Sequence, residues 1–228
     1  MSPKHSSIVF DIETLAYDFD KFDEVQQKYL LKFAKTDEER EVELQKLALY
    51  PLTARIIAIG LNNPYTGMGK VYYQADKNEE FKSDDGKVTY VATDEKGILT
   101  NFWETIGHYD RIITFNGRAF DCPFIMIRSM ILGVKATRNI MPYRYGSNKH
   151  CDLLEQLTFY GAMKKFNLDF YTKSFGIKSP KSDGITGLDL GDMFKEKKFK
   201  EIARYCYGDI IATSELYKRV EEYFTLSE

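Results

Sequence analysis

The sequence predicts an α/β protein in which a mixed β-sheet is flanked by helices, with a helical insertion after the first strand. Apolar runs of strand length occur at residues 7–14, 55–61 and 111–115. Apolar residues spaced by three or four positions, typical of an amphipathic helix, continue through residues 199–224. Strands and helices that alternate in this way along one chain favour a mixed sheet with helices on its faces.

The length and composition indicate one domain spanning residues 1–228, with the helical insertion at about 17–50. The chain is 43% hydrophobic and 29% charged, as in ordinary globular proteins. Its net charge of −2 is no global signature of nucleic-acid binding, although a local groove can still be basic.

Three cysteines, Cys122, Cys151 and Cys206, are widely spaced and odd in number. They fit reduced thiols better than a disulfide framework, and no Cys/His spacing typical of zinc sites is present. No apolar run is long enough to span a membrane, and residues 1–7 lack the apolar core of a signal peptide. We therefore expect a cytoplasmic protein.

The first strand carries two acidic residues, Asp11 and Glu13, which project from the same face because strand side chains alternate. Two carboxylates on a buried strand repel each other and lose hydration unless cations or hydrogen-bond donors lie between them. Oxygen ligands of this kind suit magnesium or manganese rather than zinc. Taken alone, the pair is equally consistent with a solvated strand end or a turn.

The insertion is predicted to form two short helices, and it holds eleven Asp or Glu against six Lys or Arg when counted over residues 11–50. This charge makes it a poor phosphate-binding surface and suggests a solvated helical cover or a lid beside the site. Residues 55–61 then predict a central strand. Residues 70–75 and 87–93 predict antiparallel strands separated by a polar turn at 84–86, and a helix follows at about 96–109.

A second acidic position follows the strand at 111–115. Asn116-Gly117 predicts a tight turn, and Pro123 suits the first turn of a helix that continues to Leu132. Asp121 then lies at the helix N-terminus, where capping alone explains an Asp. The carboxyl ends of strands are also where α/β active sites are usually built, and Asp121 is on the same side of the sheet as Glu13 if the two strands are parallel neighbours.

The segment from residue 131 to 187 is read as a loop at 131–147, a short strand at 150–153, helices at 154–161 and 167–175, and a loop at 178–187. Asp152 is most simply the cap of the first of these helices. Residues 160–204 hold ten Lys or Arg against six Asp or Glu. This is the most basic part of the chain, which suggests phosphate contacts, although lysine-rich helices are usually only solvated.

The last helix places Asp209 within its apolar stripe, where an unpaired charge is costly. Tyr205 lies one turn earlier on the same face, so its hydroxyl and the Asp209 carboxylate can reach the same point. Asp209 is mid-helix, which excludes a capping role. A buried Asp satisfied by a hydroxyl or a water is the alternative to metal binding.

Together these stretches resemble the three exonuclease motifs of the DEDD superfamily in its tyrosine-bearing branch. The likeness is greatest to the proofreading exonuclease domain of family-B DNA polymerases and to related stand-alone predicted exonucleases. The segment 168–187, with Lys181 and Gly184-Ile185-Thr186-Gly187, also resembles the stand-alone group. The motif residues are Asp11-Ile12-Glu13-Thr14, Asn116-Gly117-x-x-Phe120-Asp121-x-Pro123-Phe124 and Tyr205-x-x-x-Asp209.

The resemblance implies an RNase H-like fold and a set of catalytic residues. It implies that four acids hold two divalent metal ions, Mg²⁺ or Mn²⁺, and that Tyr205 positions the attacking water. These acids are Asp11, Glu13, Asp121 and Asp209. The resemblance also implies contacts of the substrate with Thr14, Leu15, Asn116, Phe120 and Lys181.

The expected function is that of a metal-dependent 3′–5′ exonuclease that hydrolyses DNA, preferably single-stranded, by a two-metal mechanism. One alternative is the same chemistry on RNA, which contacts to the 2′-hydroxyl would decide. Another is a module that binds a nucleic-acid end without cutting it, which the intact acids argue against. The sequence does not indicate a polymerase or repair partner.

Overall fold

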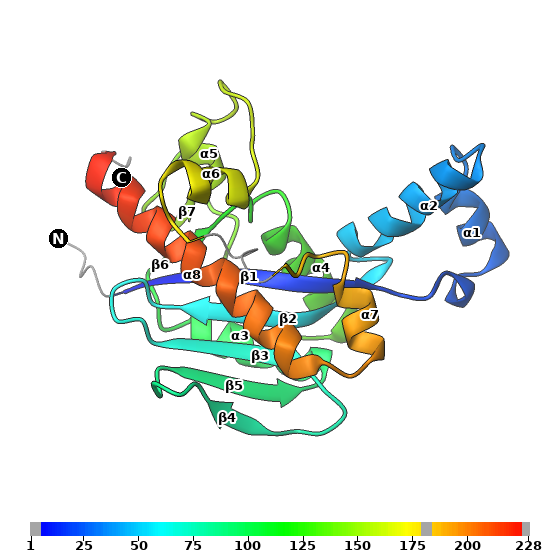
Figure 1. Ribbon diagram of the computed structural model, residues 1–228, viewed down its shortest axis with the longest axis horizontal. Helices are drawn as coiled ribbons and strands as arrows, with labels where there is room; N and C mark the ends of the chain where they lie inside the picture. Colours follow the sequence, from blue (N-terminus) through cyan, green and yellow to red (C-terminus); the bar gives the residue numbers. More distant parts are fainter. Residues whose placement is uncertain (1–5, 179–183, 225–228) are drawn as a thin grey trace.

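The structure, a computed structural model, describes residues 6–178 and 184–224. The described residues form a seven-stranded mixed sheet in the order β4-β5-β3-β2-β1-β6-β7 (Figure 1). The strands are β1 (Ser7–Ala16), β2 (Ala54–Asn62), β3 (Gly69–Gln74), β4 (Glu80–Lys82), β5 (Val88–Thr93), β6 (Arg111–Thr114) and β7 (His150–Asp152).

The first strand, β1, pairs with β2 on one side and with β6 on the other. Its pairing with β2 is antiparallel and its pairing with β6 is parallel. The condition that places Asp121 on the same side of the sheet as Glu13, namely that their strands are parallel neighbours, is therefore met. The β1–β2 register shifts between Glu13 and Thr14, an irregularity of the kind that re-aims side chains near active sites.

The predicted antiparallel pairing of residues 70–75 with residues 87–93 is wrong, because β3 and β5 are parallel. The antiparallel partner of β5 is β4, and the turn that includes Asp84 and Gly86 connects these two strands. The error arose because β4 has only three residues and two of them are charged, so it has almost no apolar pattern.

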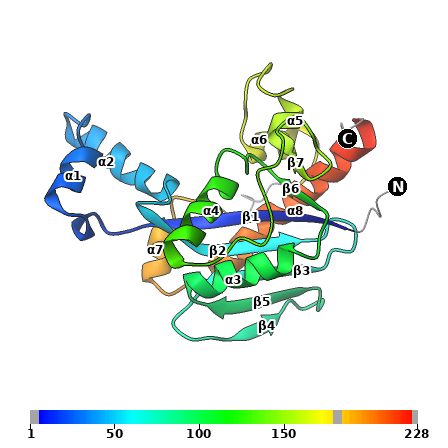
Figure 2. The same ribbon diagram turned by 180° about the vertical axis from the view of Figure 1, so that it is seen from behind.

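Helices cover both faces of the sheet. Viewed as in Figure 1, α8 crosses one face, and the reverse view shows α3 and α4 on the other (Figure 2). The helices of the described residues are α1 (Glu24–Leu30), α2 (Asp37–Lys46), α3 (Glu95–Ile106), α4 (Asp121–Leu132), α5 (Leu153–Leu157), α6 (Leu168–Ser174), α7 (Leu190–Lys195) and α8 (Phe199–Tyr223), with short 3-10 turns at Phe19–Lys21 and Leu47–Leu49.

The alternation of β1 decides which side chains meet α8. Ile8, Phe10 and Ile12 belong to the core beneath α3 and α4. Val9 belongs to the core beneath α8. Since successive strand residues point to opposite faces, Asp11 and Glu13 share the face of Val9 and project toward α8.

A glycine opposite Asp11 lets α8 approach the sheet closely. Gly60 of β2 pairs with Asp11 in the antiparallel register. A Cβ atom on Gly60 would lie 2.0 Å from Ile210 Cδ1 and 3.2 Å from Cys206 Sγ. The side chains of α8 therefore occupy the space that any larger residue would fill.

The insertion forms the two predicted helices, and it projects from the sheet as a helical arm (residues 17–50; Figure 1). Capping boxes begin both helices, at Asp23 and Thr36. Neither helix contains a buried residue. The arm is joined to the body at its base, where Thr14 Oγ1 donates to the Ala48 carbonyl at 2.7 Å. It is thus a solvated element that does not cover the sheet in this structure.

The structure differs from the sequence predictions at two further helices. The helix predicted at 154–161 ends at Leu157, because Phe159 and Tyr160 adopt positive φ angles of 49° and 56°. The short helix α7 was not anticipated; it follows residues predicted only as a loop. The part of the chain that the structure describes contains no helix long and apolar enough to cross a membrane.

Candidate active site

Three elements bring the predicted acidic residues together. Strand β1 carries two of them, the first residue of α4 is the third, and the middle of α8 carries the fourth. We call this set the acid cluster: Asp11, Glu13, Asp121 and Asp209. The four lie close enough that charge repulsion within the set raises the pKa values of Asp11, Glu13 and Asp121.

Burial is the main cause of the raised pKa values in the acid cluster. The pKa of Asp11 is well above its usual range, first because of burial and then because of repulsion by Asp121, Glu13 and Asp209. Glu13 is only 8% exposed, and burial followed by Asp209 and Asp121 raises its pKa in the same way. The cluster therefore holds protons, or must hold cations, near neutral pH.

Asp121 links the second motif to the first. Its Oδ1 accepts a hydrogen bond of 3.0 Å from the main-chain N–H of Ile12. Asp121 is the first residue of α4, and Phe120 occupies the capping position without a side-chain cap. The capping explanation for this Asp is thus incomplete. Burial raises the pKa of Asp121 to about 7, although the Ile12 N–H opposes that shift.

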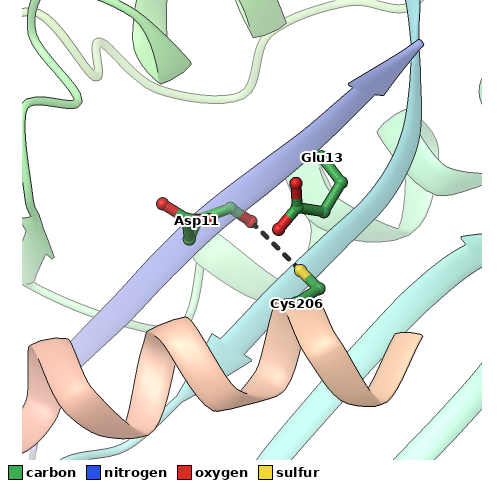
Figure 3. Close-up of side chains that lie close together, drawn as sticks. All are labelled: Asp11, Glu13 and Cys206. Carbon is green, nitrogen blue, oxygen red and sulfur yellow. Dashed lines mark hydrogen bonds between the residues drawn. The ribbon is translucent and has the colours of Figure 1, made fainter. Parts of the chain in front are cut away.

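Cys206 lies beneath the acid cluster. The Cys206 sulfur and one carboxylate oxygen from each of Asp11 and Glu13 lie within 4.8 Å of one another (Figure 3). The thiol donates to the Asp11 main-chain carbonyl at 3.9 Å. Burial and the nearby carboxylates raise the pKa of Cys206 well above its usual range, so the sulfur stays protonated. Cys206 is therefore a packing residue rather than a good metal ligand.

Tyr205 stands beside the acid cluster, one helical turn before Asp209. Its pKa is raised by burial and then by the charges of Glu13, Asp209 and Asp11. The hydroxyl consequently stays protonated. Within the described part of the chain no hydrogen bond satisfies this hydroxyl, so its proton is available to a bound water.

A groove of about 310 Å³ opens beside the acid cluster. It is lined by residues of β1, α5, α6 and α8, of the loop between β6 and α4, and of the segment just before α6. They are Asp11, Phe115, Asn116, Leu154, Phe166, Asn167, Leu168, Asp169, Tyr205 and Asp209. A ligand in this groove would meet carboxylates at one side and aromatic and amide side chains at the other.

Asp152 holds the loop between β6 and α4 (residues 115–120) in place. Its carboxylate caps α5, as the sequence predicted, by accepting from the N–H groups of Leu154 and Glu155. It also accepts from the main-chain N–H groups of Asn116 at 3.0 Å and Arg118 at 2.9 Å. Asn116 has a φ of 64°, a conformation that Asn tolerates better than most residues.

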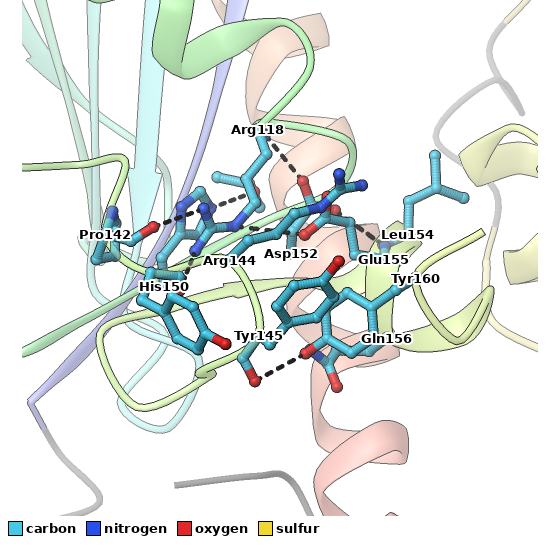
Figure 4. A network of polar contacts seen from close by, with 12 residues as sticks. Arg118, Pro142, Arg144, Tyr145, His150, Asp152, Leu154, Glu155, Gln156 and Tyr160 are labelled. Atoms are coloured by element: carbon cyan, nitrogen blue, oxygen red, sulfur yellow. Dashed lines mark hydrogen bonds and ion pairs between the residues drawn. The ribbon is translucent and has the colours of Figure 1, made fainter. Parts of the chain in front are cut away.

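Arg118 is a structural residue that the sequence reasoning missed. Its guanidinium donates to the carbonyls of Pro142 and Tyr143 and lies 3.4 Å from Glu155 Oε2 (Figure 4). Arg144 binds the other oxygen of Glu155 at 2.7 Å. No local pattern marks these contacts, because the partners are separated by 11 to 37 residues in the chain.

The predicted substrate-contacting residues are placed differently from one another. Asn116 lines the groove beside the acid cluster. Thr14 is engaged with the base of the helical arm, and Leu15 packs in a small cluster around α7. Phe120 packs against the core with its ring 5.5 Å from that of Phe124. Lys181 lies outside the described residues.

The residues of the acid cluster fit divalent cations of the hard, oxygen-binding kind. Buried carboxylates that raise one another's pKa values are costly when ionised, and a cation between them removes that cost. The sulfur of Cys206 is protonated and no histidine belongs to the group found at this site, so zinc is a poorer match.

Comparison with known proteins shows that this chain matches a protein family. Residues 70–225 match the family described as predicted 3′–5′ exonucleases related to the exonuclease domain of PolB. That region includes Asp121, Tyr205 and Asp209, and it begins after the first motif.

Two archaeal polymerases are similar to this chain. DNA polymerase 1 of Sulfolobus acidocaldarius is 28% identical over 135 residues, which are 53% of this chain and 15% of the polymerase. The family B DNA polymerase of Pyrobaculum calidifontis superposes with a TM-score of 0.59 at 17% identity, over 94% of this chain and 24% of the polymerase. The second similarity confirms the RNase H-like fold. This chain thus spans a minor part of the length of either polymerase, and by its family match it belongs to the predicted 3′–5′ exonucleases related to the exonuclease domain of PolB.

Proposed function

We propose that this chain is a metal-dependent 3′–5′ exonuclease that hydrolyses phosphodiester bonds at the 3′ end of single-stranded DNA. One observation carries the proposal. Four carboxylates from β1, α4 and α8 converge beside an open groove, where charge repulsion within the set helps to raise the pKa values of Asp11, Glu13 and Asp121. A fold gains no stability from such a cluster unless something positively charged binds it.

The acid cluster would hold two divalent ions, Mg²⁺ or Mn²⁺. When bound in such a site, a pair of metals activates water and stabilises the leaving oxygen of an in-line displacement. Asp11, whose pKa is raised by repulsion from the other three acids, would be one of the residues that hold these ions. The hydrogen bond from Ile12 fixes the orientation of the Asp121 carboxylate before any ligand arrives.

Tyr205 would orient the attacking water. Its raised pKa keeps the hydroxyl protonated, so it acts as a hydrogen-bond donor and not as a base. Tyr205 lies one helical turn before Asp209 and near Glu13. Its hydroxyl would therefore reach the same water molecule that donates hydrogen bonds to these two carboxylates. Tyr205 is therefore proposed as a positioning residue for the nucleophile.

The test is degradation of a 5′-labelled single-stranded oligonucleotide, offered as DNA and as RNA, with Mg²⁺, Mn²⁺ or EDTA. The Asp11→Asn variant is the control for contaminating nucleases. A ladder that shortens from the 3′ end, needs metal and disappears in the variant supports the proposal, and its rate on each polymer identifies the preferred sugar. Retained binding without cleavage of either polymer would overturn it in favour of an end-binding module.

A further inference from the structure

A second cavity continues from the groove beside the acid cluster. It has a volume of about 360 Å³ and shares Asn116 and Leu154 with that groove. The loop between β6 and α4 therefore forms a wall common to both. A chain that passes the acid cluster in the groove can extend into this cavity without leaving the surface.

The second cavity is lined by cations that the acid cluster lacks. Arg118, Arg144 and Lys165 line it, together with the carboxylates of Asp152 and Glu155. Both carboxylates are already engaged by the protein. Asp152 accepts four main-chain hydrogen bonds, and Glu155 binds one arginine at each oxygen. The remaining charge that a ligand meets is positive.

Two of the three cations are accessible to a ligand. The Arg118 side chain is only 6% exposed, and its guanidinium already contacts the carbonyls of Pro142 and Tyr143 and the carboxylate of Glu155. The Arg144 side chain is 52% exposed, and only its Nε is engaged by Glu155. Lys165 is exposed and makes no ion pair with the residues that the structure describes. Arg144 and Lys165 are thus the groups that can contact a phosphate.

Aromatic rings flank these cations. Tyr143 is 76% exposed and Tyr145 is 53% exposed. Their rings are 5.7 Å apart, and the ring of Tyr145 is 4.9 Å from that of Tyr160 (Figure 4). Exposed rings beside cations are the usual surface for single-stranded nucleic acids, because stacking tolerates any base. The helical arm also exposes rings beside a cation, since Lys32 lies over the rings of Tyr29 and Phe33, but most charged side chains of the arm are acidic and would repel phosphates.

We propose that Arg144 and Lys165 form a second phosphate-binding subsite, an inference that rests on the proposed function. The subsite would hold the backbone of a single strand several nucleotides away from the bond to be cut. The strand would run from the acid cluster past Asn116 into the second cavity. The subsite increases affinity for long strands and takes no part in the reaction. Loss of the subsite should therefore weaken the binding of long strands and leave the binding of very short substrates unchanged.

The experiment compares a small substrate with a long one. The p-nitrophenyl ester of thymidine 5′-monophosphate occupies only the acid cluster, whereas a single-stranded oligonucleotide reaches both sites. The variants are Lys165→Ala and Arg144→Ala/Lys165→Ala. The matched control is Lys82→Ala/Lys87→Ala, which removes the same charge near β4 and β5, at the other edge of the sheet.

We expect the double variant to raise the KM for the oligonucleotide by roughly tenfold, with the single variant intermediate and hydrolysis of the ester unchanged. The slope of log KM against log salt should fall by about 0.7 for each cation removed. Lys165→Ala keeps the inference testable if loss of Arg144 disturbs Glu155. Equal KM values in variants and control would overturn the subsite alone. A wild-type protein that hydrolyses neither substrate would overturn the proposed function as well.

Discussion

The main-chain N–H of Ile12 donates a hydrogen bond of 3.0 Å to Asp121 Oδ1, joining residues 109 positions apart. Ile12 lies between the two acids of β1, and Asp121 begins α4. One bond therefore sets the position of the third carboxylate relative to the first two. It also makes Asp121 part of the fold as well as part of the proposed metal site.

Substitutions at Asp121 should separate these two roles. Asp121→Asn keeps an oxygen for the Ile12 N–H, so we expect a folded protein whose activity falls by roughly 10³-fold or more. Asp121→Ala leaves that buried N–H without its acceptor and should in addition cost about 1–3 kcal/mol of unfolding free energy. Chemical denaturation and oligonucleotide cleavage measure the two effects. Equal stability of both variants would contradict the structural role of the bond.

Metal-free protein should lose stability as pH rises toward neutrality. Burial raises the pKa of Asp121 to about 7, above the value of 3.8 for an unperturbed Asp. Between these values the folded state binds more protons than the unfolded state, so stability falls with increasing pH. Raised pKa values of Asp11 and Glu13 act in the same direction.

Thermal unfolding in EDTA between about pH 4 and pH 7 measures this loss, with Asp121→Asn as the reference that lacks the Asp121 titration. Added Mg²⁺ or Mn²⁺ should raise the melting temperature most at the upper end of the range, where the carboxylates are ionised. A difference between wild type and variant that does not change with pH would contradict the raised pKa.

Tyr205→Phe should lower kcat by about tenfold, the factor expected for one hydrogen bond in the transition state. The KM and the metal concentration needed for half-maximal activity should stay unchanged, because the ring and the four carboxylates remain. Steady-state kinetics with metal titration provide the measurement. A loss of metal affinity equal to the loss of kcat would show that the hydroxyl supports the ions and not the water.

Gly60→Ala should displace α8 and with it Asp209. The added methyl would lie 2.0 Å from Ile210 Cδ1, and overpacking of this kind costs about 1–3 kcal/mol. Ile210→Val removes the clashing atom and should partly restore both stability and cleavage in the double variant.

Gly208→Ala is the matched control, because its Cβ meets nothing within 4 Å and a helix gains about 1 kcal/mol from this change. Thermal unfolding and cleavage assays report on both glycines. If Gly60→Ala left cleavage unchanged, close approach of α8 would not be a requirement of the site.

Local sequence patterns predicted much of this molecule. The apolar spacing of α8 extends over about seven turns. The bounds of this helix, and the presence of Asp209 within its apolar stripe, could therefore be recognised without tertiary contacts. Alternation in β1 placed Asp11 and Glu13 on one face. The three-residue strand β4 and the early end of α5 were missed, because short elements with few apolar residues have little periodicity to detect.

The sequence by itself determined which residue types stand at each candidate position and which face of each element they occupy. Only the tertiary structure decided that β1 and β6 are neighbours, that Gly60 admits α8, and that Asp152 supports the loop beside the groove. Periodicity acts within one helix or strand. The distance between two carboxylates instead depends on sheet order and on packing between residues far apart in the chain.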